Sequence, residues 1–104
     1  MAVLPTVADA PGRERFEIAV DGEVVGFLAY HRTPRALSLI HTEIEPGHEG
    51  EGLGSQLISA VLDTARAEGV QVLPICPFVR EFIEEHKEYL DLVPAERRAE
   101  FKLD

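Results

Sequence analysis

The stretch EGEGLGSQL, from Glu49 to Leu57, places glycines at every second position and then runs directly into an apolar helical pattern. The helical pattern consists of Leu53, Leu57, Val61 and Ala65, and Gly69 stands where a left-handed C-terminal cap belongs. We therefore expect a helix from about Gly52 to Glu68. Glycines before a helix leave unpaired N–H groups open at the positive end of the helix dipole, which is an arrangement that binds anions.

Two common phosphate-binding motifs do not match this loop. The dinucleotide fingerprint needs a third glycine where this chain has Ser55, and the P-loop needs a lysine, which is absent between Met1 and His86. A strand-to-helix turn also uses glycine for its geometry alone, and that structural interpretation stays open. The loop by itself therefore does not identify a ligand.

Three strands are predicted before the loop. A two-residue alternation starts at Phe16 and is followed by an Asp-Gly hairpin signal, and two further apolar runs end at Tyr30 and at Glu45. Short connections between these runs predict an antiparallel three-stranded meander. In the third strand, the alternation places one set of residues on the same face: Leu37, Leu39, His41, Glu43 and Glu45.

A strand and a second helix are predicted after the first helix. The apolar run Val70 to Cys76 predicts a buried strand, and a right-handed crossover would make it parallel to the third strand. Pro77 suits the first position of a helix whose inner face is expected to contain Phe78, Val79, Phe82, Ile83 and His86. The fold class is α+β, with a loose arm at residues 1–12, one domain at 13–93 and a short helix or tail at 94–104.

The composition argues against several classes of function. The 104 residues suffice for one domain, and 19 acidic against 10 basic residues give a net charge of -9, which does not suit a protein that grips nucleic-acid phosphates. We expect no membrane span, because no apolar run approaches ~18 residues. The absence of a basic-then-apolar leader and the single cysteine predict a cytoplasmic protein. The spacing of histidines and the lone Cys76 predict no metal site.

Two sequence blocks give the chain a family resemblance. The first is the strand end Glu43-Ile44-Glu45-Pro46 followed by the glycine loop. The second is His41-Thr42-Glu43 with Leu73-Pro74-Ile75-Cys76-Pro77-Phe78-Val79 and His86-Lys87-Glu88-Tyr89. Together with the order of elements, from about Phe16 to Val93, they resemble the GNAT acetyltransferase superfamily and more narrowly its small YjdJ-type branch. The resemblance implies a minimal GNAT-like fold and acetyl-CoA (coenzyme A) as the cofactor.

The resemblance also assigns cofactor-binding residues. The backbone near Ile44 would orient the pantetheine arm and polarise the thioester carbonyl. The loop would wrap the pyrophosphate with backbone amides, and its members are Glu49, Gly50, Glu51, Gly52, Leu53, Gly54 and Ser55. The superfamily usually has glutamine or arginine where this chain has Glu49. We therefore expect the backbone to carry the recognition and both acidic side chains to point outward into water.

Three residues are candidates for the chemistry. Glu43, Ile44 and Cys76 are expected to line the gap where the two parallel strands separate. Cys76 also precedes Pro77 at a helix N-terminus, where the dipole stabilises a thiolate, so it is a candidate general acid or a transiently acetylated nucleophile. Ile83 stands where the resemblance implies a tyrosine acid. His41 is a candidate base near neutral pH, with Glu43 as its competitor; a structural histidine and a buried, inert cysteine are the alternatives.

The resulting prediction is an acetyl-CoA-dependent N-acetyltransferase that moves an acetyl group to an amine by direct attack. The alternative is a CoA-binding or protein-interaction module of the same fold with little or no catalysis, favoured by Ile83, the acidic loop and the short chain. A third possibility is a small α+β interaction domain without a cofactor. The acceptor and the oligomeric state are not predicted; the acidic surface favours a cationic acceptor.

Overall fold

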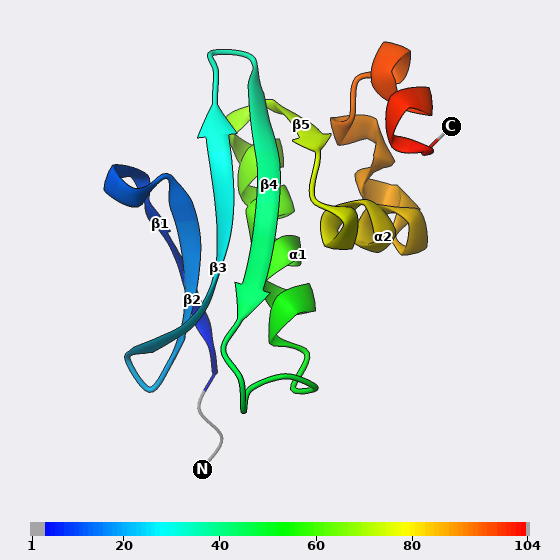
Figure 1. Cartoon of the computed structure of the whole chain (residues 1–104). Coiled ribbons are helices and arrows are strands. Elements are labelled where there is room, and N and C mark those ends of the chain that lie inside the picture. Colours follow the sequence, from blue (N-terminus) through cyan, green and yellow to red (C-terminus); the bar gives the residue numbers. More distant parts are fainter. Residues whose placement is uncertain (1–3, 104) are drawn as a thin grey trace.

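The computed structural model describes residues 4–103, which form one sheet and two main helices. The sheet has the order β1-β2-β3-β4-β5 (Figure 1). Its antiparallel part consists of β1 (Thr6–Ala10), β2 (Arg15–Val20), β3 (Glu23–Arg32) and β4 (Ala36–Ile44), and β5 (Gln71–Pro74) pairs parallel to β4. The helices are α1 (Leu53–Glu68) and α2 (Pro77–Glu85). The predicted meander, helix, parallel strand and second helix are confirmed, and the sheet has one strand more than predicted.

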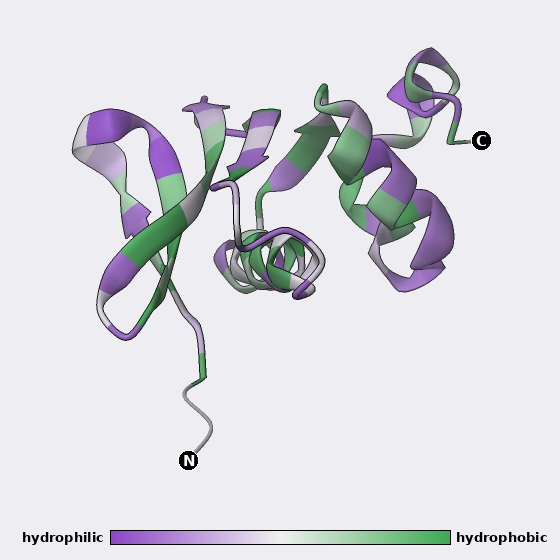
Figure 2. Ribbon diagram, turned by 60° about the horizontal axis from the view of Figure 1, so that its bottom comes forward, coloured by the Kyte–Doolittle hydropathy of each residue, from purple (hydrophilic) through white to green (hydrophobic). Residues whose placement is uncertain are grey.

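Helix α1 lies along one face of the sheet and is seen almost end-on in Figure 2. Its buried side consists of Leu53, Gly54, Leu57, Ile58, Val61, Leu62 and Ala65, which matches the spacing in the sequence. The helix ends at Gly69, whose φ of 72° lets its N–H reach the carbonyl oxygens of Ala65 and Arg66. The predicted bounds and C-terminal cap of this helix are confirmed.

The second helix begins and ends close to the prediction, but one of its apolar side chains does not face the core. Pro77 is the first helical residue, and Val79, Phe82 and Ile83 are buried. Phe78 is 49% exposed, so its assignment to the inner face is wrong. Its ring instead lies over the first turn of α1, because a Cβ added to Gly54 would lie 3.1 Å from the Phe78 ring.

The C-terminal segment is neither a regular α-helix nor a solvated tail. It contains the short 3₁₀ turns η3 (Ala95–Arg97) and η4 (Ala99–Phe101), after η2 (Lys87–Leu92). Phe101 and Leu103 are buried and belong to the main hydrophobic cluster. Burial of these two side chains explains why a charged stretch holds an ordered position.

The N-terminal segment differs from the predicted loose arm. Residues 1–3 lie outside the described residues, but Thr6–Ala10 forms β1 and pairs antiparallel with β2, and Pro11–Arg13 forms the short turn η1. The prediction of an arm is therefore wrong for this stretch. The sequence TVADA has only one large apolar residue, Val7, and its order comes from pairing with β2 and from contacts to distant side chains.

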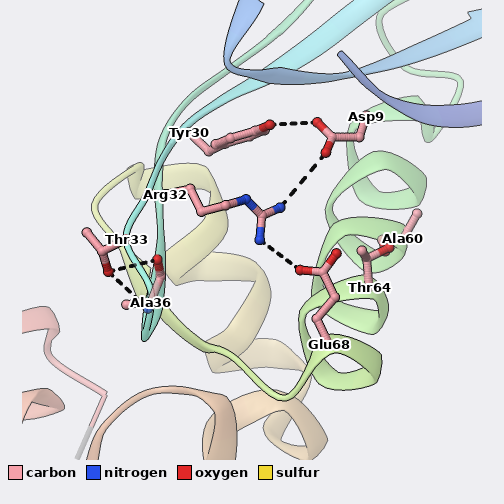
Figure 3. Close-up of polar contacts among 8 residues, drawn as sticks. All are labelled: Asp9, Tyr30, Arg32, Thr33, Ala36, Ala60, Thr64 and Glu68. Atoms are coloured by element: carbon pink, nitrogen blue, oxygen red, sulfur yellow. Dashed lines mark hydrogen bonds and ion pairs between the residues drawn. The ribbon is translucent and has the colours of Figure 1, made fainter. Parts of the chain in front are cut away.

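A polar cluster joins β1 to β3 and α1 (Figure 3). The Tyr30 hydroxyl donates a hydrogen bond of 2.7 Å to Asp9, and Arg32 donates one of 2.8 Å to Glu68. Arg32 also lies 3.9 Å from the second carboxylate oxygen of Asp9. Tyr30 is only 5% exposed as a whole residue and is the most buried member of this cluster. The cluster attaches the edge strand to the rest of the fold.

This cluster predicts a stability change at alkaline pH. Burial of Tyr30 and, second, its hydrogen bond to Asp9 raise the pKa of the hydroxyl from 10.0 to about 12. Because the pKa is higher in the folded state, this contribution to stability is complete below pH 10 and is lost as the pH rises through about 12. Chemical denaturation should show the free energy of unfolding falling across this interval. Tyr30→Phe has no hydroxyl to ionise, so an equally steep fall in that variant would contradict the assignment.

A β-bulge in β4 reverses the faces predicted for its second half. Ala29 pairs with His41, but the next residue of β3, Tyr30, pairs with Leu39, so Ile40 is an extra residue in β4. Leu37 and Leu39 are buried under α1. The extra residue shifts the β3–β4 pairing register by one position, so Thr42 pairs with the buried Leu28.

His41 and Glu43 consequently lie on the opposite face of the sheet from Leu37 and Leu39. The prediction that all four share a face is wrong, because the single extra residue breaks the two-residue period. We call the face turned away from α1 the outer face.

No helix within residues 4–103 is long and apolar enough to cross a membrane.

Candidate active site

The two parallel strands separate after a short paired segment, as predicted. The β4–β5 register ends at Leu39 and Pro74, and the Cys76 N–H then donates a last hydrogen bond of 2.8 Å to the Leu39 carbonyl. β4 continues to Ile44, whereas the other chain turns into α2. Pro74 and Pro77 have no N–H to extend a ladder, which favours this separation.

A groove of about 1080 Å³ opens at the separation. Thr42 and Ile44 contribute to it from the β4 face that carries Leu39, and Phe78 contributes from α2. The groove continues around the end of β4 to the outer face, where His41, Glu43 and Phe27 line it. It therefore connects the α1 side of the sheet with the outer face.

Most of the residues predicted for the site lie on this one groove. The members that line it are His41, Glu43, Ile44, Glu49, Gly50, Gly52, Leu53, Gly54 and Ser55. Glu51 does not line it, and its carboxylate instead accepts a 3.1 Å contact from the His48 ring. The loop thus turns Glu51 away from the groove, as expected, while Glu49 remains at its wall.

The first turn of α1 presents free backbone donors to the groove. Gly50 and Gly52 have φ values of 84° and 77°, in the left-handed region that favours glycine. The first helical hydrogen bond of this turn runs from the Gln56 N–H to the Gly52 carbonyl, 3.1 Å away. Within the described residues, the N–H groups of Leu53, Gly54 and Ser55 donate no hydrogen bond. These three donors can therefore bind an anion.

Cys76 lies behind the groove wall and does not line it. It is the N-cap residue of α2, as predicted, but it is only 3% exposed. Its sulfur lies 3.5 Å from the Thr42 hydroxyl oxygen, and Thr42 does line the groove. The prediction that Cys76 lines the gap is thus wrong. The bulge at Ile40 directs the Thr42 side chain inward, so that Thr42 lies between the sulfur and the groove.

Side chains of both charge signs line the groove. Glu43, Glu45 and Glu49 are acidic, and Arg15 is the one arginine among the lining residues. Arg15 donates a 2.8 Å hydrogen bond to Glu17, and its guanidinium lies 4.5 Å from the centre of the Phe27 ring. The His41 ring approaches the edge of Phe27, with 6.1 Å between the ring centres. His41 therefore lies beside an aromatic wall and next to carboxylates.

Sequence reasoning missed Thr42, Phe27 and Phe78 as parts of the site. The two-residue alternation puts Thr42 on the face opposite Leu39, and the helical spacing puts Phe78 in the core, whereas both residues line the groove. The available signal for Phe78 was Gly54 in the first turn of α1, because a glycine without a side chain leaves room for a ring. No residue type in β4 indicated the bulge. Ile83, where the resemblance implies a tyrosine, is fully buried in the core.

Comparison with known proteins gives a match over most of the chain. Residues 15–92 match the model of a family described as GCN5-related N-acetyl-transferase. A curated relative is streptothricin acetyltransferase of Streptomyces lavendulae, 35% identical over 63 residues. This match covers 59% of the chain but only 33% of that enzyme, so the chain spans about a third of the relative's length.

Solved structures share the fold at lower identity. A GCN5-like protein of Staphylococcus aureus superposes with a TM-score of 0.65 at 21% identity, covering 86% of this chain and 87% of that one. Ribosomal-protein-alanine N-acetyltransferase of Brucella melitensis has a TM-score of 0.56 at 24% identity, with coverages of 78% and 61%. Ard1 of Thermoplasma volcanium has a TM-score of 0.51 at 23% identity, with coverages of 57% and 41%. Fold, groove and family match agree, and the chain belongs to the GCN5-related N-acetyltransferase (GNAT) family.

Proposed function

We propose that this protein is an acetyl-CoA-dependent N-acetyltransferase that acetylates an amine by direct attack on the thioester. The observation that carries the proposal is the groove, which joins the free amides at the start of α1 to the separation between β4 and β5. An anionic group at one end and a reactive group at the other can thus occupy one continuous space. The family match supports acetyl transfer as the reaction.

The glycine turn suits the pyrophosphate of the substrate. Each amide hydrogen bond to a charged oxygen contributes roughly 1.5 to 3 kcal/mol. A carboxylate about 7 Å from a phosphate repels it by roughly 0.6 kcal/mol in water and about 2.4 kcal/mol at an effective dielectric constant near 20. Three amides therefore outweigh the one carboxylate, Glu49, that the loop leaves on the groove wall. The other, Glu51, is turned toward His48.

The acceptor amine would approach from the outer face. His41 and Glu43 line that end of the groove, and either can remove a proton from an incoming ammonium. The nitrogen then attacks the thioester carbonyl held between the separated strands, and the CoA thiolate leaves. Carboxylates at this end of the groove, including Glu43 and Glu45, favour an acceptor with positive charge.

Two measurements test the proposal. Calorimetric titration with CoA should show binding to the purified protein, and thiol release from acetyl-CoA should rise when a panel of amines is added. Absence of CoA binding would refute both acetyl transfer and a CoA-binding role. Binding without thiol release across the panel would leave the second candidate, a CoA-binding module without catalysis. That candidate is favoured by the buried Ile83, which puts no tyrosine hydroxyl at the family's usual acid position.

Removing the charge of Glu49 is expected to strengthen CoA binding. Glu49 lines the groove, so Glu49→Gln removes a repulsion of roughly 0.6 kcal/mol or more and should lower the Kd by about 3-fold or more. The difference should shrink as salt is added, because screening weakens the repulsion in the wild type. Glu51→Gln is the matched control, since that carboxylate faces His48. Equal effects of the two substitutions, or weaker binding by Glu49→Gln, would contradict this account.

A further inference from the structure

We propose that Thr42 is the catalytic residue that protonates the departing thiolate, and that it draws this proton from Cys76. The inference rests on the proposed acetyl transfer and assigns a step that the fully buried Ile83 cannot perform. Thr42 lines the groove where the parallel strands separate, and its hydroxyl is 3.5 Å from the Cys76 sulfur. Either of these two atoms can be the donor, so the pair can pass a proton in either direction.

The position of Thr42 follows from the bulge in β4. The extra residue Ile40 turns Thr42 toward the interior, opposite the buried Leu28, while its neighbours His41 and Glu43 point to the outer face. One strand therefore presents a base to the acceptor side and a hydroxyl to the thioester side at adjacent positions. Proton removal from the amine and proton delivery to the leaving sulfur can then occur on opposite faces of β4.

The burial of Cys76 explains why a hydroxyl is needed between the sulfur and the substrate. Cys76 is 3% exposed and does not line the groove, and among the described residues Thr42 is the hydrogen-bond partner that connects its thiol to the groove. Because the donor Cys76 and the departing CoA sulfur are both thiols, the transfer connects chemically similar groups. The thiolate left on Cys76 would lie at the N-cap of the nine-residue helix α2, whose dipole stabilises negative charge.

The proton balance closes over one turnover. The amine nitrogen forms a bond to the carbonyl carbon, and the carbon–sulfur bond of the thioester breaks. The CoA sulfur takes the hydroxyl proton of Thr42 as Thr42 takes the S–H proton of Cys76. The nitrogen loses two protons. His41 takes the first from the ammonium and releases it to solvent, and the second, lost after the nitrogen has attacked the carbonyl carbon, passes through water to the Cys76 thiolate. The products are an amide, free CoA thiol and one proton in solution, and Thr42, Cys76 and His41 regain their starting protonation.

Four variants of the Thr42–Cys76 pair and one control variant test the relay by activity. Thr42→Val, which keeps the shape but lacks the hydroxyl, should lower kcat by about 10²-fold, the usual size of a general-acid contribution. The KM for acetyl-CoA should change little, and Thr42→Ser should restore most of the rate. Cys76→Ala should lose as much as Thr42→Val, and the double variant should lose no more, since both residues serve one transfer. Thr64→Val is the matched control, because that hydroxyl bonds only the Ala60 carbonyl on α1.

An infrared measurement tests the contact without any catalysis. Cys76 is the only cysteine in the chain, so the S–H stretching band of the protein reports this one thiol. Thr42→Val should shift the band, while Thr42→Ser and Thr64→Val should leave it in place. Wild-type transfer together with an unimpaired Thr42→Val, additive losses in the double variant, or an unshifted band would overturn the relay. A wild type that releases no thiol with any amine would overturn the acetyl-transfer proposal itself.

Discussion

Replacing His41 with alanine is expected to lower kcat for acetyl transfer by about 10²- to 10⁴-fold while CoA still binds. The ammonium form of an amine has no lone pair, so attack requires a base on the acceptor side. His41 lines the outer end of the groove, away from the glycine turn that would hold the pyrophosphate. Imidazole is also better matched to proton transfer near neutral pH than a carboxylate is.

Two further variants identify the base. Glu43→Gln should cost less than His41→Ala, because Glu43 then contributes mainly charge. His31→Ala is the matched control, since that histidine is also exposed on a strand, 4.0 Å from Glu14, but does not line the groove. Raising the pH should reduce the defect of His41→Ala, as more of the acceptor is already deprotonated in solution. A larger loss in Glu43→Gln than in His41→Ala would assign the base to Glu43 instead.

Replacing Gly26 with alanine is expected to destabilise the fold by about 1 to 3 kcal/mol or more. An added Cβ would lie 2.5 Å from Ile44 Cδ1 and 2.8 Å from the Glu43 carbonyl oxygen. The side chain of Ile44 can rotate, but the carbonyl belongs to the backbone of β4 and can move only with the strand. Thermal unfolding should show the loss as a Tm lower by about 4 to 8 °C per kcal/mol.

The same substitution should also affect the site. Glu43 and Ile44 line the groove, so a displaced β4 should weaken CoA binding in the fraction that remains folded. Gly12→Ala provides the control, because no heavy atom lies within 4 Å of the Cβ position there. Gly26→Ala with unchanged Tm would mean that β3 and β4 approach less closely than the structure shows.

Part of the site could be predicted because it depends on neighbouring residues in the chain. Gly50 and Gly52 adopt positive φ values that glycine tolerates, and they lead into a helix whose apolar spacing is plain in the sequence. Pro77 begins α2 because its missing N–H costs nothing there, which places Cys76 at the N-cap. Local rules of this kind also explain the success of the helix bounds and of the crossover.

The remaining features depend on contacts between distant parts of the chain. Thr42 and Cys76 are 34 residues apart, and their contact exists only because the bulge turns one side chain inward. Phe78 lies outside the core because Gly54, on another helix, has no side chain and leaves space for the Phe78 ring. β1 is ordered through Tyr30 and its pairing with β2.

Local sequence rules specify the helices, the caps, the parallel crossover and the glycine turn, because φ preferences and apolar periodicity act within a few residues. Long-range contacts set which face His41 and Glu43 occupy, that Thr42 separates Cys76 from the groove, and that the N-terminal stretch joins the sheet. One inserted residue, Ile40, reverses a two-residue period without leaving any mark in composition. Its position is set by the pairing of β4 with β3, which no local pattern records.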